Sequence, residues 1–501
     1  MNTIFNEGQN HQPGKMPPQE NRGATPPDTN IHEQNLKIAL DVGTTKVVAV
    51  AGYRNQNGKI QVVDYSVLQN TGMVQGEIFN LLETADTIRH VKEELEMKLG
   101  RPIRKVTVGI SGDHIRTLYT REYFIRTDPS ELISDEDLNQ LAQMARKSVI
   151  INPNEEILDV YPQAFLVDNQ VVHGSPVGAL GKRLEASFMV VVGNVEKIKK
   201  LERSIDMAGL EIEDIFLQPI ASARAVMKEP QCQLGMALVD IGGGTSDILI
   251  CNKGKVRFAG IIPYGGDYIT TEIIQKFHLT PSMAEMIKMR YGSVKPDAAE
   301  KNITLQIPLD WSPKPLRIKR EMLSETIRFK VDIIINEIDR FLNEYREFFP
   351  GEQIGLGLIV TGGGSQMKNL IQYLQFKLGM DVTLGDPRAL LAPDAKIERL
   401  YQPQFATVIG LLDLALQKEK ESQKEPSEWR SDKRQEPGSS GISQNNRPQT
   451  NTLEGKKHED KDVDKLLQNP DAFSPKKQNL VKRLLQNFST IFGKVVDETN
   501  N

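Results

Sequence analysis

One short pattern occurs twice in this chain, about 200 residues apart, and it constrains the fold more than any other feature. Residues 36–45 read LKIALDVGTT, and residues 236–250 read MALVDIGGGTSDILI. In each copy an apolar strand ends in an aspartate, Asp41 or Asp240, and a glycine-rich turn leads at once into a second apolar strand. Glycine allows a close backbone approach, and the N–H groups of such a turn can face an anion. The repetition predicts two similar half-domains around a shared cleft.

A nucleotide with Mg²⁺ is the ligand that this arrangement favours. Asp41 and Asp240 are expected to flank the metal, through water, because Mg²⁺ keeps several water ligands and takes few carboxylates. The phosphates are expected to lie against Gly43, Thr44, Thr45, Gly242, Gly243, Gly244 and Thr245. Lys46 either reaches a phosphate or is a solvated turn lysine. A single hairpin of this kind is more often an ordinary turn, so the argument depends on the repetition.

A third glycine cluster follows another apolar strand. It comprises Gly362, Gly363, Gly364 and Ser365, and a helix is expected to open at Met367. A helix N-terminus after three glycines suits close packing against a nucleotide. Neither the P-loop pattern nor a strand-borne GxGxxG occurs, so those two nucleotide-binding folds are disfavoured.

By composition the 501 residues divide into four segments. Residues 36–416 alternate apolar strands with helical patterns such as 83–99, 195–208 and 325–349, which indicates an α/β architecture. Residues 1–34 and 417–475 are poor in aliphatic side chains and are expected to be a disordered arm and a disordered linker. Residues 476–496 turn apolar again.

Overall composition excludes several classes. A net charge of -4 argues against a chain that is basic throughout for nucleic acid. There is no run of about 18 apolar residues that would span a membrane, and the N-terminus lacks an apolar signal core. Two cysteines are too few for a disulfide framework, which favours a reducing compartment.

The last apolar segment reads as an amphipathic helix. Its apolar residues repeat at helical spacing, and Lys482 and Arg483 stand among several basic residues near it. The stripe comprises Leu480, Val481, Leu484, Leu485, Phe488, Ile491 and Phe492. An apolar stripe with basic flanks is typical of an anchor lying in the plane of an anionic membrane surface. The alternative is a helix that docks on the folded core or on a partner, but a core helix needs no tether of about 60 residues.

Five segments in order resemble the nucleotide motifs of the actin superfamily, over residues 36–416. They are DVGTTK, LQPIASARAV, DIGGGTSD, TGGGS and FATVIGLL. Finer signatures, GISGDHIRT, SPVGALGKRLE, IPYGGDYITTEI and AEMIKMRYG, resemble the FtsA family of bacterial cell-division proteins. Other members of the superfamily fit less well. Heat-shock chaperones carry a large substrate domain after the ATPase, and sugar kinases need a sugar pocket. The cell-shape protein MreB lacks the tail, and pilus-assembly relatives usually lack the anchor.

The resemblance implies an actin-like ATPase fold of two related halves around a nucleotide cleft, with an inserted 1C subdomain. The implied order is 1A at 36–111, 1C at 112–192, 1A again at 193–234, 2A at 235–267, 2B at 268–345, and 2A with the return to 1A at 346–416. It also implies that Glu285 and Lys288 contact the ribose or base; the alternative is a surface ion pair. Bacterial relatives often carry glutamate where Gln218 stands. An amide orients water but cannot accept its proton, so hydrolysis is expected to be slow or conditional.

The expected function is that of an ATP-binding division protein. The resemblance implies self-association into filaments, tethering of the FtsZ ring to the cytoplasmic face of the cell membrane, binding of the FtsZ C-terminal peptide through subdomain 2B, and recruitment of later division proteins. No nucleic acid is expected. The competing class is an enzyme, either a chaperone-like ATPase or a small-molecule kinase.

Overall fold

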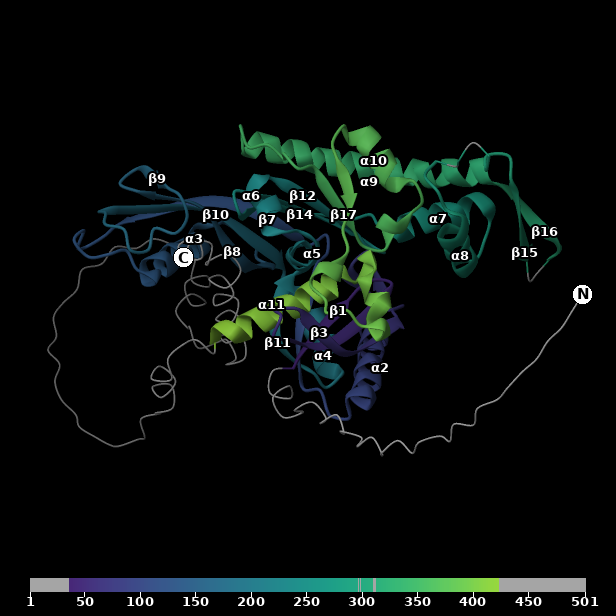
Figure 1. The fold of residues 1–501 in the computed structure, drawn as a ribbon, viewed down its shortest axis with the longest axis horizontal. Helices are drawn as coiled ribbons and strands as arrows, with labels where there is room; N and C mark the ends of the chain where they lie inside the picture. The colour runs from purple at the N-terminus through teal and green to yellow at the C-terminus, as the bar shows by residue number, and fades with distance from the viewer. Residues whose placement is uncertain (1–35, 296, 298, 310–311, 423–501) are drawn as a thin grey trace, which may run out of the picture.

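The computed structural model describes residues 36–295, 297, 299–309 and 312–422. Within these residues, none of the helices is both long enough and apolar enough to cross a membrane. The described chain forms two halves and one inserted subdomain, which lie below, above and to the left in Figure 1.

Each half is built on a five-stranded sheet, and the two sheets have the same topology. In both, one central strand pairs antiparallel with the next strand of a hairpin and parallel with a later strand. The first sheet has the order β11 (Glu211–Leu217), β6 (Lys105–Ile110), β1 (Lys37–Val42), β2 (Lys46–Arg54), β3 (Ile60–Gln69). The second has the order β18 (Val382–Leu384), β17 (Leu358–Thr361), β12 (Met236–Ile241), β13 (Ser246–Asn252), β14 (Lys255–Ile262). The predicted pair of half-domains is therefore confirmed as a duplicated topology.

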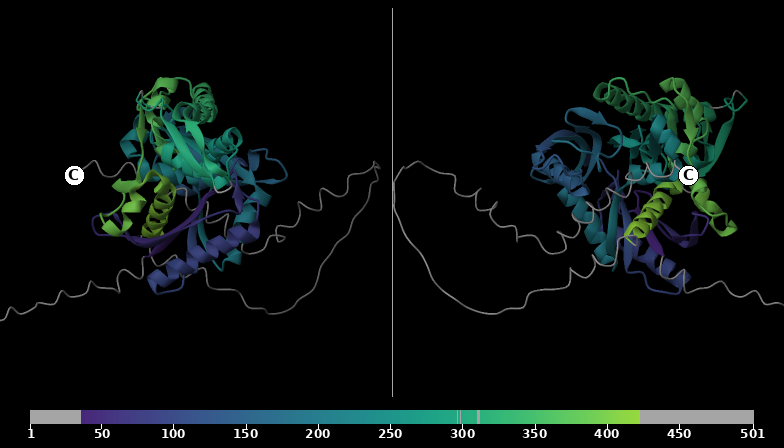
Figure 2. Two further views of the ribbon diagram at one scale, coloured as in Figure 1. Left: turned by 90° about the vertical axis from the view of Figure 1, so that its right-hand side faces the viewer. Right: turned by 60° about the vertical axis from the view of Figure 1, so that its left-hand side comes forward.

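Helices cover these sheets. The first half carries α2 (Leu81–Leu99), α4 (Val195–Met207), α5 (Gln218–Val226) and α11 (Ala406–Ser422), with a small hairpin of β4 (Met73–Val74) and β5 (Glu77–Ile78). The short helix α6 (Glu229–Leu234) packs on β13 of the second half. Figure 2 shows α11, in yellow-green, against the purple strands of the first sheet. Asp413 holds α11 there, because its buried carboxylate accepts from Arg54 of β2 and Arg224 of α5, each at 2.7 Å.

Within the described chain, the second half carries four helices and a β-hairpin in addition to its sheet. Its helices are α7 (Gly266–Phe277), α8 (Pro281–Tyr291), α9 (Arg320–Phe348) and α10 (Leu370–Leu378), and a hairpin pairs β15 (Thr304–Leu309) with β16 (Ser312–Lys319). α9 buries Ile327, Val331, Ile334 and Ile338 at helical spacing, which fixes the face it turns to α7 and the sheet. Short 3₁₀ turns η1 (Gly364–Gln366), η2 (Pro387–Ala389), η3 (Ala395–Tyr401) and η4 (Pro403–Phe405) connect the last elements.

The inserted subdomain has its own sheet and core. Its strands run β7 (Ile115–Ile125), β10 (Arg183–Asn194), β8 (Glu155–Val167), β9 (Gln170–Val172), and α3 (Asp135–Ser148) covers them. Leu141 and Ala145 of α3 are fully buried against this sheet. A capping box at Ser134 and Asp137 sets the start of α3, since each residue bonds the other's backbone N–H.

Three expectations are wrong in detail. α11 continues to Ser422, so the chain is still helical where the linker was expected to begin at residue 417. The apolar pattern weakens before the helix ends, which explains the error. No α-helix opens at Met367: the tight 3₁₀ turn η1 intervenes, and α10 begins only at Leu370. Finally, a disulfide joins Cys232 to Cys251, whose Cα atoms are 4.9 Å apart, so cysteine number no longer supports a reducing compartment.

Candidate functional site

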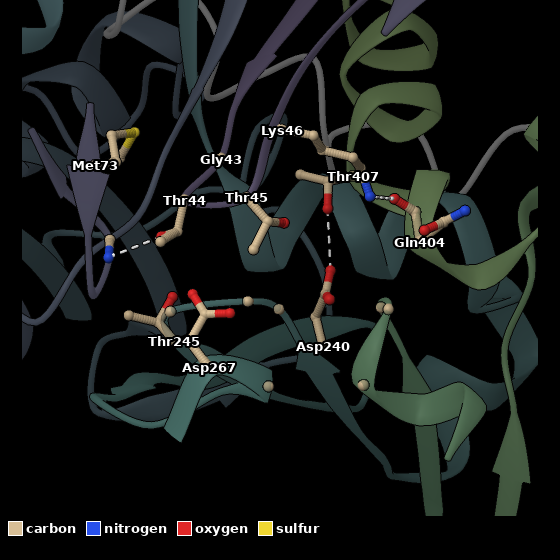
Figure 3. Close-up of a pocket in the computed structure, with 18 of the residues that line it drawn as sticks. Gly43, Thr44, Thr45, Lys46, Met73, Asp240, Thr245, Asp267, Gln404 and Thr407 are labelled. Carbon is tan, nitrogen blue, oxygen red and sulfur yellow. Dashed lines mark hydrogen bonds between the residues drawn. The ribbon is translucent and has the colours of Figure 1, made fainter. Parts of the chain in front are cut away.

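The two repeated turns line one cavity of about 780 Å³ between the halves. The turn between β1 and β2 (residues 43–45, the first turn) and the turn between β12 and β13 (residues 242–245, the second turn) face each other across it, as Figure 3 shows. The residues predicted for the nucleotide all line this cavity except Ser365. They are Asp41, Gly43, Thr44, Thr45, Lys46, Gln218, Asp240, Gly242, Gly243, Gly244, Thr245, Glu285, Lys288, Gly362, Gly363 and Gly364.

The two turns interlock. Each is closed by one backbone bond, from Gly43 N–H to the Lys46 carbonyl at 3.0 Å and from Gly242 N–H to the Thr245 carbonyl at 2.9 Å. A Cβ on Gly243 would lie 2.3 Å from Cγ2 of Thr45, and one on Gly244 would lie 2.5 Å from Oγ1 of Thr44. Glycine is therefore required at positions 243 and 244, because the threonines of the first turn occupy the space that a larger side chain would need.

The two strand-end aspartates are held differently. The Gln218 amide donates to Oδ1 of Asp41 at 2.9 Å, which leaves the amide oxygen of Gln218 as an acceptor. Oδ2 of Asp240 accepts from Ser222 at 2.6 Å and from Thr407 at 3.0 Å; the latter bond is drawn in Figure 3. Ser222 lies on α5 and Thr407 on α11, so helices of the first half fix the aspartate of the second half.

A third carboxylate, Asp247, lies beside these two and was missed by the sequence analysis. It stands directly across the β12–β13 hairpin from Asp240, and its Oδ1 accepts from Ser111 at 2.7 Å. Burial, and then the negative charge of Asp240, raises the pKa of Asp247 to about 8. Burial likewise raises the pKa of Asp41 to about 6 and that of Asp240 above its usual range.

These carboxylates fit a divalent cation. The raised pKa values show that the ammonium of Lys46 does not fully offset the clustering of three acids in one place, and oxygen donors of this kind are what Mg²⁺ takes. The signal for Asp247 was present in the sequence. If Gly242 and Thr245 close the turn, strand pairing puts residue 247 opposite residue 240.

Lys46 is not a solvated turn lysine. Its Nζ donates to the backbone carbonyl of Gln404 at 2.9 Å and lies 5.0 Å from the centre of the Phe405 ring. Burial lowers the pKa of Lys46, and the charges of Asp41 and Asp240 oppose that shift. The ammonium therefore belongs to the charge balance of the cavity, between the aspartates and η4.

Glu285 and Lys288 are more than a surface ion pair. The Lys288 ammonium is buried and bonds Glu285 at 2.7 Å, Thr270 at 2.7 Å and the Gly266 carbonyl at 2.9 Å. Both residues line the cavity on the α8 side. Their role toward a ribose or base stays a prediction.

The third glycine cluster closes the wall beside Asp240. Gly362 has a φ of 84°, and a Cβ there would lie 2.2 Å from Oδ1 of Asp240. Ser365 instead holds the turn itself, because its hydroxyl donates to the Gly362 carbonyl at 2.6 Å. It supports the cluster from behind the cavity wall.

Asp267 is a further cavity residue that the sequence analysis passed over. It opens α7, whose first N–H groups donate to the carbonyls of the second turn, Gly266 to Gly242 at 2.9 Å and Asp267 to Gly243 at 2.8 Å. The start of α7 thus supports the second turn from below. The motif IPYGGDYITTEI contains it, but only the fold shows why the helix must begin there.

The residues proposed for membrane binding lie outside the described residues. These are Leu480, Val481, Lys482, Arg483, Leu484, Leu485, Phe488, Ile491 and Phe492.

Comparison with known proteins identifies relatives. A family model described as "Cell division protein FtsA" matches residues 237–410, and one described as "SHS2 domain inserted in FTSA" matches residues 112–192. The cell division protein FtsA of Pseudomonas aeruginosa is 30% identical over 392 residues, which covers 78% of this chain and 91% of that protein. The FtsA of Bacillus subtilis is 27% identical over 387 residues, covering 77% of this chain and 84% of the relative.

Among solved structures, the "PilM-PilN type IV pilus biogenesis complex" is similar in fold. Its TM-score is 0.56 at 16% identity, and the comparison covers 76% of this chain and 98% of that one. At this identity the likeness speaks for the fold alone. The fold is actin-like, with two halves of matching topology around a cleft.

Proposed function

This chain belongs to the FtsA family of cell division proteins, and we propose that it binds ATP with Mg²⁺ between its halves and ties the FtsZ ring to the cytoplasmic face of the cell membrane at the division site. The observation that carries the nucleotide part is the interlocked pair of turns around one cavity. The membrane part rests on the amphipathic pattern of residues 476–496.

Each wall of the cavity would have its own task. The N–H groups of the two turns, with the hydroxyls of Thr44, Thr45 and Thr245, would bind the phosphates. Asp41, Asp240 and Asp247 would hold Mg²⁺, largely through water, and the metal would neutralise charge on the phosphates. Glu285 and Lys288 would meet the sugar or base at the α8 side, with the Gly362–Gly364 wall packed behind the nucleotide.

Hydrolysis in this proposal is slow. The Gln218 amide group is committed to Asp41, so its oxygen can orient a water molecule but cannot take the proton. Nucleotide binding and nucleotide turnover are therefore separate properties of this chain.

The remaining parts of the proposal concern assembly. Subunits would associate head to tail into filaments, because a repeating heterologous contact that does not close gives a filament. Residues 268–345 would bind the C-terminal peptide of FtsZ, and the assembled protein would recruit later division proteins. If residues 423–475 are a flexible linker, its r.m.s. span would be roughly 35–45 Å, which would let the core stand off from the membrane.

Calorimetric titration with ATP tests the nucleotide part. Saturable binding at one site, lost when Mg²⁺ is chelated, is expected from the three buried carboxylates. Absence of binding at millimolar ATP would remove the nucleotide from the proposal, whatever the membrane result.

Sedimentation with anionic vesicles tests the membrane part. Phe492→Glu removes one buried aromatic, worth on the order of 1.5–3 kcal/mol, and adds a charge beside anionic lipid, so binding should fall roughly tenfold or more. Gln486→Glu is the matched control: it adds the same charge on the opposite side of the helical period and should change binding much less. If Phe492→Glu instead lowers the melting temperature of the core and leaves vesicle binding intact, the segment docks on the protein.

A further inference from the structure

The chain connects the inserted subdomain (residues 112–192) to the first half at two crossings, and Leu158 and Met189 of the subdomain also belong to the apolar cluster that includes Ile198 of the first half. The chain leaves the first half after β6, enters β7 at Ile115 and returns through β10 to α4. Ile115 and Gly193 are paired neighbours, so both crossings lie side by side. Each crossing contains a glycine, Gly112 with a φ of 145° and Gly193 at the end of β10, and small residues are common at hinges.

The outgoing crossing and the helix that follows the return crossing line the cavity. Ser111 and His114 stand on the outgoing segment, and Lys197 and Lys200 stand on the first turns of α4, just after the return. Ser111 also donates to Asp247 of β13 at 2.7 Å. A change at this end of the cavity therefore reaches the base of the inserted subdomain without passing through any other element.

The far side of the same subdomain is bonded to the second half. Tyr119 of β7 donates to the Arg257 carbonyl of β14 at 2.7 Å, and the Gln163 amide of β8 donates to the Val256 carbonyl at 2.9 Å. In return the Arg257 guanidinium donates to the Gln163 carbonyl at 2.8 Å. We call these contacts between β7, β8 and β14 the seam; the labels of β7 and β14 adjoin in Figure 1.

The seam is buried and continues into α9. Gln163 and Arg257 are 3% and 7% exposed. Arg257 also bonds Glu352 at 3.0 Å, just beyond the end of α9, and the Tyr119 ring packs on Phe348 and Phe349 at 5.2 and 5.7 Å between centres. Buried hydrogen bonds of this kind are costly to leave unmade, and aromatic contacts add to them.

We infer that the inserted subdomain moves with the second half, although the chain inserts it into the first. When the two turns separate, either the seam breaks or the two glycine-bearing crossings bend. The seam holds several buried bonds and aromatic contacts, whereas each crossing carries a glycine at the border with the first half. The crossings bend there, and the inserted subdomain pivots about Gly112 and Gly193.

This makes the inserted subdomain a reporter of cleft opening. Its outer surface changes direction relative to the first half whenever the turns move apart. The inference needs only that the halves can separate, so it does not rest on ATP being the ligand.

Distance measurements between spin labels on the full-length chain test it. Exposed positions for the labels are Glu93→Cys on α2 of the first half, Gln140→Cys on α3 of the inserted subdomain and Gln372→Cys on α10 of the second half. Opening is forced without nucleotide by Gly244→Val, whose side chain would collide with Thr44 and with the backbone at Gln75 and Gly76.

Gly244→Val is expected to lengthen the 93–372 and 93–140 distances and to leave the 140–372 distance unchanged. The inference is overturned if 140–372 shifts while 93–140 stays constant, and equally if the steric variant moves none of the three distances. Adding ATP and Mg²⁺ to the labelled protein without Gly244→Val is a separate experiment. If none of the three distances changes on this addition, the result counts against the nucleotide proposal but not against the inference tested with Gly244→Val.

A second experiment weakens the seam. Gln163→Leu combined with Tyr119→Phe removes two seam hydrogen bonds and keeps the bulk of both side chains. In this background, forced opening should also broaden or shift the 140–372 distance. Gln170→Leu, an exposed glutamine of the same subdomain away from the seam, is the matched control and should behave as the parent does. An unshifted 140–372 distance in the folded double variant would show that the seam does not carry the coupling.

Discussion

The two turns occupy equivalent places in equivalent sheets, yet they carry different side chains. The first turn reads Gly-Thr-Thr and the second Gly-Gly-Gly. Position by position, Thr44 corresponds to Gly243 and Thr45 to Gly244, and the Cβ positions of those two glycines fall on the threonine side chains of the other turn. The comparison shows that the two facing turns cannot have the same sequence. Because Thr44 and Thr45 of the first turn fill the space between them, Gly243 and Gly244 of the second turn have no room for side chains.

The strands behind the turns differ as well. Val48 stands opposite Asp41, whereas Asp247 stands opposite Asp240. The first half therefore contributes one carboxylate and the amide of Gln218, while the second contributes two carboxylates. Under the proposed binding of ATP with Mg²⁺, the second half would therefore be the principal metal side and the first half would place the water.

The largest effect is expected where the second turn meets backbone. Neither Gly243 nor Gly244 has a left-handed φ, so a new methyl group costs space alone. At Gly244 that methyl would lie 2.8 Å from the Gln75 Cα and from the Gly76 N, which cannot rotate away. Gly244→Ala should lower ATP affinity by roughly 100-fold, at the upper end of the ~1–3 kcal/mol cost of overpacking. Calorimetry measures this, and Thr44→Gly should not restore affinity.

A smaller and reversible effect is expected at Gly243. The nearest contacts of a Cβ there all belong to the side chain of Thr45, at 2.3 to 3.3 Å. Gly243→Ala should weaken ATP binding roughly tenfold or somewhat more. In a double-mutant cycle, Thr45→Gly should cancel most of that loss relative to Thr45→Gly alone. Additive losses would mean that the turns do not interlock in solution.

The metal side is tested by Asp247→Asn. Asparagine keeps an oxygen that can accept from Ser111 but removes one negative charge, so the apparent Mg²⁺ affinity in the presence of ATP should fall roughly tenfold. Titration of Mg²⁺ at fixed ATP measures it. The matched change in the first half, Gln218→Leu, should leave Mg²⁺ affinity nearly unchanged, and the reverse ranking would contradict the division of labour between the halves.

The smallest change in binding is expected for Gln218→Glu. At saturating Mg²⁺, ATP affinity should be retained, and turnover should be preserved or raised because a carboxylate can accept the proton that an amide cannot. Phosphate release under single-turnover conditions is the measurement. Rapid hydrolysis by the unaltered protein would show that Gln218 does not limit the reaction.

Local patterns predicted the fold well because the duplicated element is short in sequence. Strand, aspartate, turn and strand lie within 15 residues, so β-periodicity and turn chemistry specify both hairpins without help from the rest of the chain. The same holds for the strands that end at Val42, Ile110 and Thr361. Element ends were less secure, as the continuation of α11 to Ser422 shows.

Contacts made across the chain were not predictable from local pattern. Lys46 finds its acceptor 358 residues away in the Gln404 carbonyl, and Ser111 meets Asp247 across 136 residues. For Ser365 the sequence motif predicted a residue that lines the cavity, and this prediction is wrong. Its hydroxyl donates to the Gly362 carbonyl within the same turn instead. Residue type and spacing identified the cavity, and tertiary packing decided which atoms face it.

The position of α11 has a mechanical consequence. Its 17 residues span ~25 Å, with Thr407 on Asp240 at the inner end and the exit toward residue 423 at the outer end. Tension applied to the C-terminal tail would load this helix along its axis, and the Asp413 bridges to Arg54 and Arg224 would resist its sliding. Under the proposed membrane attachment, a pull on the C-terminal tail would therefore be transmitted along this helix to the carboxylate of Asp240.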